Sequence, residues 1–210
     1  MYSNETCPVT APLTVIGTKK GSGMPLRNDS HRYGWISISL HWLVAFTVIG
    51  LFALGLWMVD LGYYDAWYRK GPDIHRSVGL LLFAVMLLRL LWRVFAPLPD
   101  ALPTHQRWEV LLAHLAHWGL YILLFVAMVS GYLISSADGS SVSVFGWFSI
   151  PSVTGHRSGL EDIAGDIHEI AVWSIIVLAS LHALAALKHH IFDRDDTLRR
   201  MLGLSPRQTP

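Results

Sequence analysis

Four long apolar segments dominate the pattern of this chain. They cover residues 36–59, 74–96, 110–137 and 163–191, and shorter polar segments separate them. The first segment carries no charged residue over 24 positions and the third carries none over 28. About 20 apolar residues are enough to cross the core of a bilayer as a helix. The pattern therefore predicts an all-α membrane protein, a bundle of four transmembrane helices.

The polar flanks divide the chain into three parts. Residues 1–30 mix Pro, Gly, Thr, Ser and Asn without a sustained period, which predicts a disordered N-terminal tail. The transmembrane domain is expected over residues 31–204, followed by a short C-terminal tail at 205–210. The patterned sequence begins just after Met24, so this methionine is a candidate natural start.

The composition narrows the class of protein. Hydrophobic residues make up 52% of the chain and charged residues only 15%, against about a quarter charged in soluble domains. The net charge of +1 gives no reason to expect a nucleic-acid partner; the expected surroundings are membrane lipid. Cys7 is the only cysteine, which excludes an internal disulfide, a cysteine-bound iron–sulfur cluster and covalent c-type haem attachment. No G-x-G-x-x-G follows a strand pattern, so a nucleotide or flavin domain is not expected.

Basic residues predict how the helices are oriented. Four spans put both termini on one side, and with these termini inside, twelve Lys and Arg residues lie in inner segments and four in outer ones. The positive-inside rule then predicts cytoplasmic termini. The inner segments sum to +5 and the outer ones to −4. Arg89 and Arg93, near the inner end of the second span, are expected to extend to the lipid headgroups.

Histidines inside the spans are the candidate functional residues. The chain has eleven histidines, and an ionisable residue within a membrane span is costly enough to suggest a function. His41 lies near the inner end of the first span and His75 near the outer end of the second. His168 lies early in the fourth span, near the outer face, and His182 follows 14 residues later.

The spacing within the fourth span is informative. Fourteen residues of α-helix bring two side chains back to within about 40° of one face and separate them by roughly 21 Å along the axis. One helix therefore presents His168 and His182 to the bundle interior at two depths. His75 is the only other intramembrane histidine near the outer side, so the depths favour a pair of His75 with His168.

The inner partner of His182 stays open at this point. His41, His114 and His117 all lie at a suitable depth, and helical geometry alone does not choose among them. His114 and His117 share a face of the third span. They could contact a haem propionate or a quinone headgroup, but interhelical hydrogen bonding is the favoured interpretation.

Two imidazole pairs at two depths of a four-helix bundle suit two bis-histidine haems. Imidazole is a good iron ligand, and bundle cores are common cofactor sites. A haem with both axial positions filled by protein works by electron transfer. Purely structural histidines are the first alternative. A metal-ion transporter is the second, but the spans offer essentially only Asp166 and Glu169 as further ligands, near the outer edge.

The remaining histidines receive no cofactor role from the sequence. Two of them follow Lys188 at the membrane exit and are interpreted as solvated interface residues, and two more lie in loops without a clear role. These four are His189, His190, His105 and His156.

Around these histidines the sequence resembles the prokaryotic cytochrome b561 family of di-haem membrane cytochromes. The resemblance runs from Arg32 to about Leu204. The matching stretches are RYGWISISLHW with His41, DIHRSVG with His75, DIHEIAVW with His168, and SLHALAALKHHIFDRDDTLRRM with His182.

The resemblance implies more than the spacing does. It implies two b-type haems per chain, one held by His41 with His182 and the other by His75 with His168. It implies a multi-pass protein of a bacterial inner membrane that oxidises superoxide at the outer face and delivers electrons to ubiquinone. The alternative is a non-enzymatic cytochrome b subunit that passes electrons between quinol and a periplasmic redox partner protein.

Overall fold

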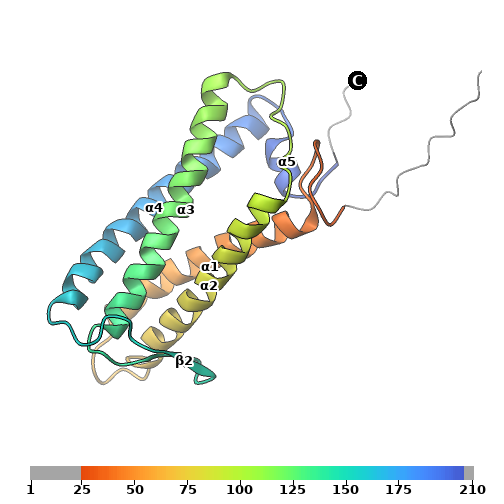
Figure 1. The fold of residues 1–210 in the computed structure, drawn as a ribbon. Helices are drawn as coiled ribbons and strands as arrows, with labels where there is room; N and C mark the ends of the chain where they lie inside the picture. Colours follow the sequence, from red (N-terminus) through yellow and green to blue (C-terminus); the bar gives the residue numbers. More distant parts are fainter. Residues whose placement is uncertain (1–24, 206–210) are drawn as a thin grey trace, which may run out of the picture.

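The computed structural model describes residues 25–205, and four long helices form its bundle (Figure 1). Each is long and apolar enough to cross a membrane, which confirms the predicted architecture. A short fifth helix follows the fourth. The helices are α1 (Trp35–Met58), α2 (Lys70–Phe95), α3 (Arg107–Ser136), α4 (Leu160–Ile191) and α5 (Thr197–Met201).

The helices begin one to four residues before the predicted spans, because the first turns of α2, α3 and α4 contain charged residues. α2 includes Pro72 in its first turn, where a missing backbone N–H costs nothing. α3 opens with a capping box, in which the backbone N–H of Gln106 donates to the Glu109 carboxylate over 3.0 Å. Hydrophobic periodicity does not register such turns, so the sequence-based boundaries fall late.

Much of the apolar surface of the bundle faces outward. The four helices have mean hydropathies between 1.9 and 2.2, yet large side chains such as Phe46, Leu88 and Val177 are mostly exposed. In water such a surface would drive association. In a bilayer the lipid chains cover it, so the arrangement fits a spanning bundle.

Small residues let the helices approach closely. α3 packs most extensively on α4, and α1 on α2. Ala127 of α3 and Ala171 of α4 are buried against each other with Ile175. At Gly119 an added Cβ would lie 3.1 Å from Leu178. Small side chains at helix contacts are typical of membrane bundles, where van der Waals packing holds the helices together.

One end of the bundle, here called the terminal end, is closed by the segment before α1. The Asn28 amide donates to the Pro97 carbonyl over 2.9 Å, and its oxygen accepts the backbone N–H of Gly34. The backbone N–H of Asp100 donates to the carbonyl of Ser30. Residues 25–30, which the sequence assigned to a disordered tail, are therefore packed on the bundle. Residues 1–24, with the rest of that tail, lie outside the described part of the chain.

α5 completes the terminal end. The indole N–H of Trp42 donates to the carbonyl of Met201 over 2.8 Å, and Arg200 donates to the carbonyl of Asp100 over 2.7 Å. The last helix is thus tied both to α1 and to the loop between α2 and α3.

The opposite end, here called the hairpin end, carries a small antiparallel hairpin between α3 and α4 (Figure 1). Its strands are β1 (Val142–Val144) and β2 (Phe148–Ile150), with Val144 opposite Phe148. Val144 is fully buried, and the backbone N–H of Phe145 donates to Ser77 of α2 over 3.1 Å. The sequence analysis had not predicted this hairpin. The bond to Ser77 holds the turn of the hairpin over the first part of α2.

Gly34 is a position where the fold tolerates no side chain. An added Cβ would lie 2.4 to 2.6 Å from backbone atoms of Leu26 and Arg27. We predict that Gly34→Ala lowers the stability of the purified protein by about 1–3 kcal/mol or more, the usual range for overpacking. Gly50→Ala, in α1 with nothing within 4 Å of the new Cβ, is the control. Thermal unfolding in detergent should separate the two, and equal melting temperatures would refute the packing argument.

Candidate redox-cofactor site

Two imidazoles face each other near the hairpin end. His75 lies in the second turn of α2 and His168 in the third turn of α4. Their ring centroids are 6.2 Å apart and their planes meet at 71°. Metal–imidazole bonds are about 2 Å long, so one metal atom between the rings could contact both. The pair inferred from helix depth is therefore brought together.

Hydrogen bonding prepares His168 to act as a ligand. Its Nδ1 lies 2.7 Å from the carbonyl oxygen of Ala127. A carbonyl only accepts, so Nδ1 carries the proton and Nε2 keeps its lone pair. Metal-bound histidines are commonly oriented by such a bond from the second ring nitrogen. His75 Nδ1 is buried and has no hydrogen-bond partner.

Glycines lie beside both rings. A Cβ added at Gly55 of α1 would be 3.4 Å from Cε1 of His75. A Cβ added at Gly131 of α3 would be 3.1 Å from Cε1 of His168. Each imidazole thus lies against a helix surface without a side chain, and a larger residue at either glycine would displace the ring.

Three histidines gather nearer the terminal end. The rings of His117 and His182 are 5.0 Å apart at 64°. His41 interacts electrostatically with both. His114, a candidate on depth alone, is exposed, and its Nδ1 lies 2.8 Å from the Val110 carbonyl of its own helix. Of the three candidate histidine partners of His182, the structure therefore leaves His41 and His117.

Arg89 turns into the bundle, which corrects the expectation that it extends to the headgroups. Its guanidinium lies 3.0 Å from Nδ1 of His41 and donates to the Leu40 carbonyl and the Tyr121 hydroxyl, at 3.3 and 3.1 Å. Arg93 also turns inward, over the Tyr121 ring at 5.6 Å. An arginine this far inside a span needs several acceptors, and the interior supplies them.

The contact with Arg89 fixes the proton of His41. A guanidinium only donates, so Nδ1 of His41 accepts and the ring proton sits on Nε2. For His41 to bind a metal through Nε2, this proton must leave. His41 is thus arranged less directly for ligation than His168.

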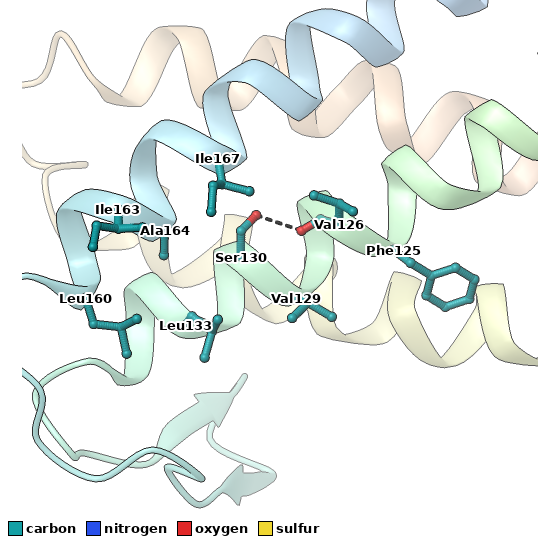
Figure 2. A pocket seen from close by; sticks show the side chains of 9 residues that line it. All are labelled: Phe125, Val126, Val129, Ser130, Leu133, Leu160, Ile163, Ala164 and Ile167. Carbon is teal, nitrogen blue, oxygen red and sulfur yellow. Dashed lines mark hydrogen bonds between the residues drawn. The ribbon is translucent and has the colours of Figure 1, made fainter.

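A groove between α3 and α4 adjoins the hairpin-end pair (Figure 2). It encloses about 360 Å³. Ser130 is its only polar lining residue; its hydroxyl donates to the Val126 carbonyl and lies 3.3 Å from Nδ1 of His168. The groove is suited to an apolar chain. Its other lining residues are Phe125, Val126, Val129, Leu133, Leu160, Ile163, Ala164 and Ile167.

A smaller cavity of about 150 Å³ opens where the hairpin meets α2. Arg76 and Ser77, which directly follow His75, line it together with Asp73 and residues of the hairpin turn. Arg76 pairs with Asp73, while its buried Nε has no hydrogen-bond partner. The wall of this cavity therefore carries a guanidinium and a hydroxyl, on the two residues that directly follow His75 in the sequence.

The sequence analysis missed a cluster at the terminal end. His105 and His189 were interpreted as a loop residue without a role and a solvated residue. Their rings are 4.6 Å apart, and their side chains are only 17% and 13% exposed. Both approach the buried carboxylate of Asp195. The acidic residues soon after His189, in the stretch KHHIFDRDD, were the available signal.

The carboxylates of this cluster are held ionised. Burial raises the pKa of Asp195, but hydrogen bonds from Thr197 and His105 outweigh it and leave that pKa below its usual value. A hydrogen bond from Lys188 lowers the pKa of Asp193. Negative charge therefore collects beside the two imidazoles.

Four spanning helices with imidazoles grouped at two depths define a membrane electron carrier of the haem b type. The chain belongs to the prokaryotic cytochrome b561 family, whose profile matches residues 32–204. This family carries b-type haem and transfers electrons in the membrane. The protein is thus a multi-pass protein of a bacterial inner membrane.

Named relatives agree with this assignment. Over 182 residues the chain is 50% identical to cytochrome b561 homolog 2 of Escherichia coli, covering 87% of this chain and 97% of the relative. It is 31% identical to "Probable superoxide oxidase CybB" of Yersinia pestis, over 81% of this chain and 96% of the relative. Cytochrome b561 homolog 1 of E. coli is 29% identical, over 82% and 97%.

Gly131 offers a test of the hairpin-end site. We predict that Gly131→Val displaces the His168 ring, since even a Cβ lies 3.1 Å from it, and so lowers haem absorbance per chain. Gly165→Val is the matched control, because nothing lies within 4 Å of a Cβ there. Absorption spectra of both purified variants give the comparison. Full haem content in Gly131→Val would show that this glycine is not needed for haem binding.

Proposed function

We propose that this protein is a superoxide:ubiquinone oxidoreductase with two b-type haems per chain. The observation that carries the proposal is the small cavity at the hairpin end, whose wall includes Arg76, the residue that directly follows the proposed ligand His75. The 31% identity to a relative named as a probable superoxide oxidase supports the same activity.

The proposed haem ligands are His75 with His168 and His41 with His182. Bound haem b supplies reversible one-electron iron chemistry. For the first pair the residues fit well, because Ala127 holds the proton of His168 on Nδ1 and glycines flank both rings. For the second pair, His41 must release its ring proton and change its contact with Arg89. Arg89 would then stay as a cation beside the site, held by the Leu40 carbonyl and the Tyr121 hydroxyl.

The overall reaction balances with simple partners. Two superoxide ions each lose one electron and leave as dioxygen, and one ubiquinone takes up both electrons and two protons to form ubiquinol. The protein must therefore admit a small anion at one place and a lipid-soluble molecule at another. The cavity at the hairpin end is small and has charged residues in its wall, whereas the groove between α3 and α4 is larger and apolar.

The small cavity suits a diatomic anion because groups in its wall can donate hydrogen bonds to it. Arg76 supplies a guanidinium donor and Ser77 a hydroxyl at its wall. Attraction at long range is not expected, because the segments of this end sum to −4 and Asp73 already pairs with Arg76. Arg76 thus attracts the anion only at short range, within a few ångströms.

The groove between α3 and α4 suits the chain of a quinone. Its lining is apolar except for Ser130, whose hydroxyl reaches towards His168. It opens between two spanning helices, where the bilayer would supply an isoprenoid chain directly. A ubiquinone tail in this groove would keep its headgroup near the hairpin-end pair.

The second candidate function is a cytochrome b subunit for a periplasmic redox protein. Exposed aromatic side chains favour it, since Tyr64 is 98% exposed and Trp147 75% exposed at the hairpin end. Aromatic residues are enriched at protein interfaces. They are equally enriched where a helix meets lipid headgroups, so the superoxide reaction remains the primary proposal.

Ligand variants test the haem assignment. We predict two haems per wild-type chain, and one in each of His75→Ala, His168→Ala, His41→Ala and His182→Ala. His117→Ala is the decisive control, because its ring lies 5.0 Å from that of His182, yet His117 is not a proposed ligand. A pyridine haemochrome assay counts the haems. One haem in His117→Ala and two in His41→Ala would show that His117, and not His41, is the ligand paired with His182.

Superoxide kinetics test the activity. We predict that superoxide reduces the purified protein in stopped flow, at a rate that stays flat or rises with added salt, because salt screens the unfavourable net field over about 10 Å at 0.1 M. Arg76→Gln should slow this step about tenfold, since a charge at contact distance is worth on the order of 1–4 kcal/mol. Arg69→Gln changes the net charge equally but does not line the cavity.

Two results would contradict the proposal. No reduction by superoxide would remove the activity and favour the partner-protein alternative. Equal slowing in Arg76→Gln and Arg69→Gln would remove the cavity as the binding place. A rate that falls steeply with salt would contradict only the expected field: it would show that basic residues dominate at this end, and it would favour a dedicated superoxide oxidase.

A further inference from the structure

The terminal end holds a second group of ligand-type side chains, separate from the imidazoles of the bundle interior. His105 comes from the loop between α2 and α3, His189 from the last turn of α4, and Asp195 from the segment before α5. Two stretches of chain that are far apart in sequence, the loop between α2 and α3 and the end of α4 with the segment after it, thus bring two imidazoles and one carboxylate together.

We propose that His105, His189 and Asp195 form a binding site for a divalent metal ion of the zinc class. The site is distinct from the proposed haem ligands and does not rest on the proposed function. It would hold the loop between α2 and α3 against the C-terminal segment.

Distances between the ligand atoms support the site. Oδ2 of Asp195 lies 3.0 Å from Nε2 of His105 and 3.4 Å from Nδ1 of His189, and all three atoms lie within 4.8 Å of one another. A tetrahedral zinc ion with bonds of 2.0–2.2 Å separates its ligand atoms by about 3.3–3.5 Å. The two distances to the carboxylate therefore differ from those of a zinc site by only a few tenths of an ångström.

Burial and hydrogen bonding also favour a metal. The side chain of Asp195 is only 3% exposed. Nδ1 of His189 is buried and lies 2.7 Å from Oδ2 of Asp193 and 3.4 Å from Oδ2 of Asp195. Two carboxylates around a buried imidazole nitrogen make a place where positive charge is stabilised.

The charges around the site set the kind of ion. Lys188 binds Asp193 and Glu109 over 2.7 and 2.9 Å, so these two carboxylates share its one positive charge. The two imidazoles, which bind metals in their neutral form, and the Asp195 carboxylate make a ligand set with one negative charge. Nitrogen ligands exclude Mg²⁺ and Ca²⁺, which take oxygen, and favour Zn²⁺.

A network without metal is the competing interpretation. The hydroxyl of Thr197 lies 3.0 Å from Nε2 of His105, so a protonated His105 could bond Thr197 and Asp195 together. That network would tie the same segments but would have no particular affinity for zinc. Metal binding therefore distinguishes the two.

The test uses the purified haem-loaded protein after dialysis against a chelator. Equilibrium dialysis with Zn²⁺, read by elemental analysis against haem iron, should give one tightly bound zinc per chain. His105→Gln and His189→Gln should weaken this binding by about tenfold or more. His114→Gln removes an exposed histidine outside the cluster and should bind zinc as the wild type does. The haem spectrum, recorded for each variant, reports folding separately.

A second measurement needs no substitution. Zn²⁺ should protect His105 and His189 of the wild type from modification by diethyl pyrocarbonate, as read by mass spectrometry. Protection of both supports the site. Absence of tight zinc binding, variants that bind as well as wild type, or bound zinc that leaves both histidines reactive would each overturn it.

Discussion

The structure depends on one constraint, that a polar group inside a bilayer must find its partner within the protein. Arg89 meets this requirement with a carbonyl, a phenol and the His41 imidazole. His168 meets it with the Ala127 carbonyl, and Ser130 with the carbonyls of its own helix. Water would satisfy such groups in many geometries. Without it the rings of His41 and His168 are each held in one orientation, which is also what a ligand to a cofactor needs.

The sequence predicted the parts of the fold that the bilayer dictates. Span length and apolar composition are set by membrane thickness, so the four helices were predicted to within a few residues. The pairing of His75 with His168 could also be predicted, because helix periodicity and depth left one partner available. These features depend on distances along a single helix, which a sequence contains.

Other features depend on how separate helices rotate against each other, and these could not be predicted. Depth allowed Arg89 to reach the headgroups, but the rotation of α2 turns it inward. Depth also left three candidates beside His182, and packing removed only His114. His105 and His189 are 84 positions apart, and only the fold shows that the loop between α2 and α3 meets the end of α4.

The tie between Trp42 and Met201 has a consequence for biogenesis. These residues are 159 positions apart, so α1 leaves the ribosome and enters the membrane long before its partner has been synthesised. The terminal end can close only after translation is nearly complete. Until then the indole N–H of Trp42 lacks this partner, and the nascent protein remains open on that side. This contact is therefore present only in completed chains, and a protease that recognises exposed ends would find the terminal end open in unfinished ones.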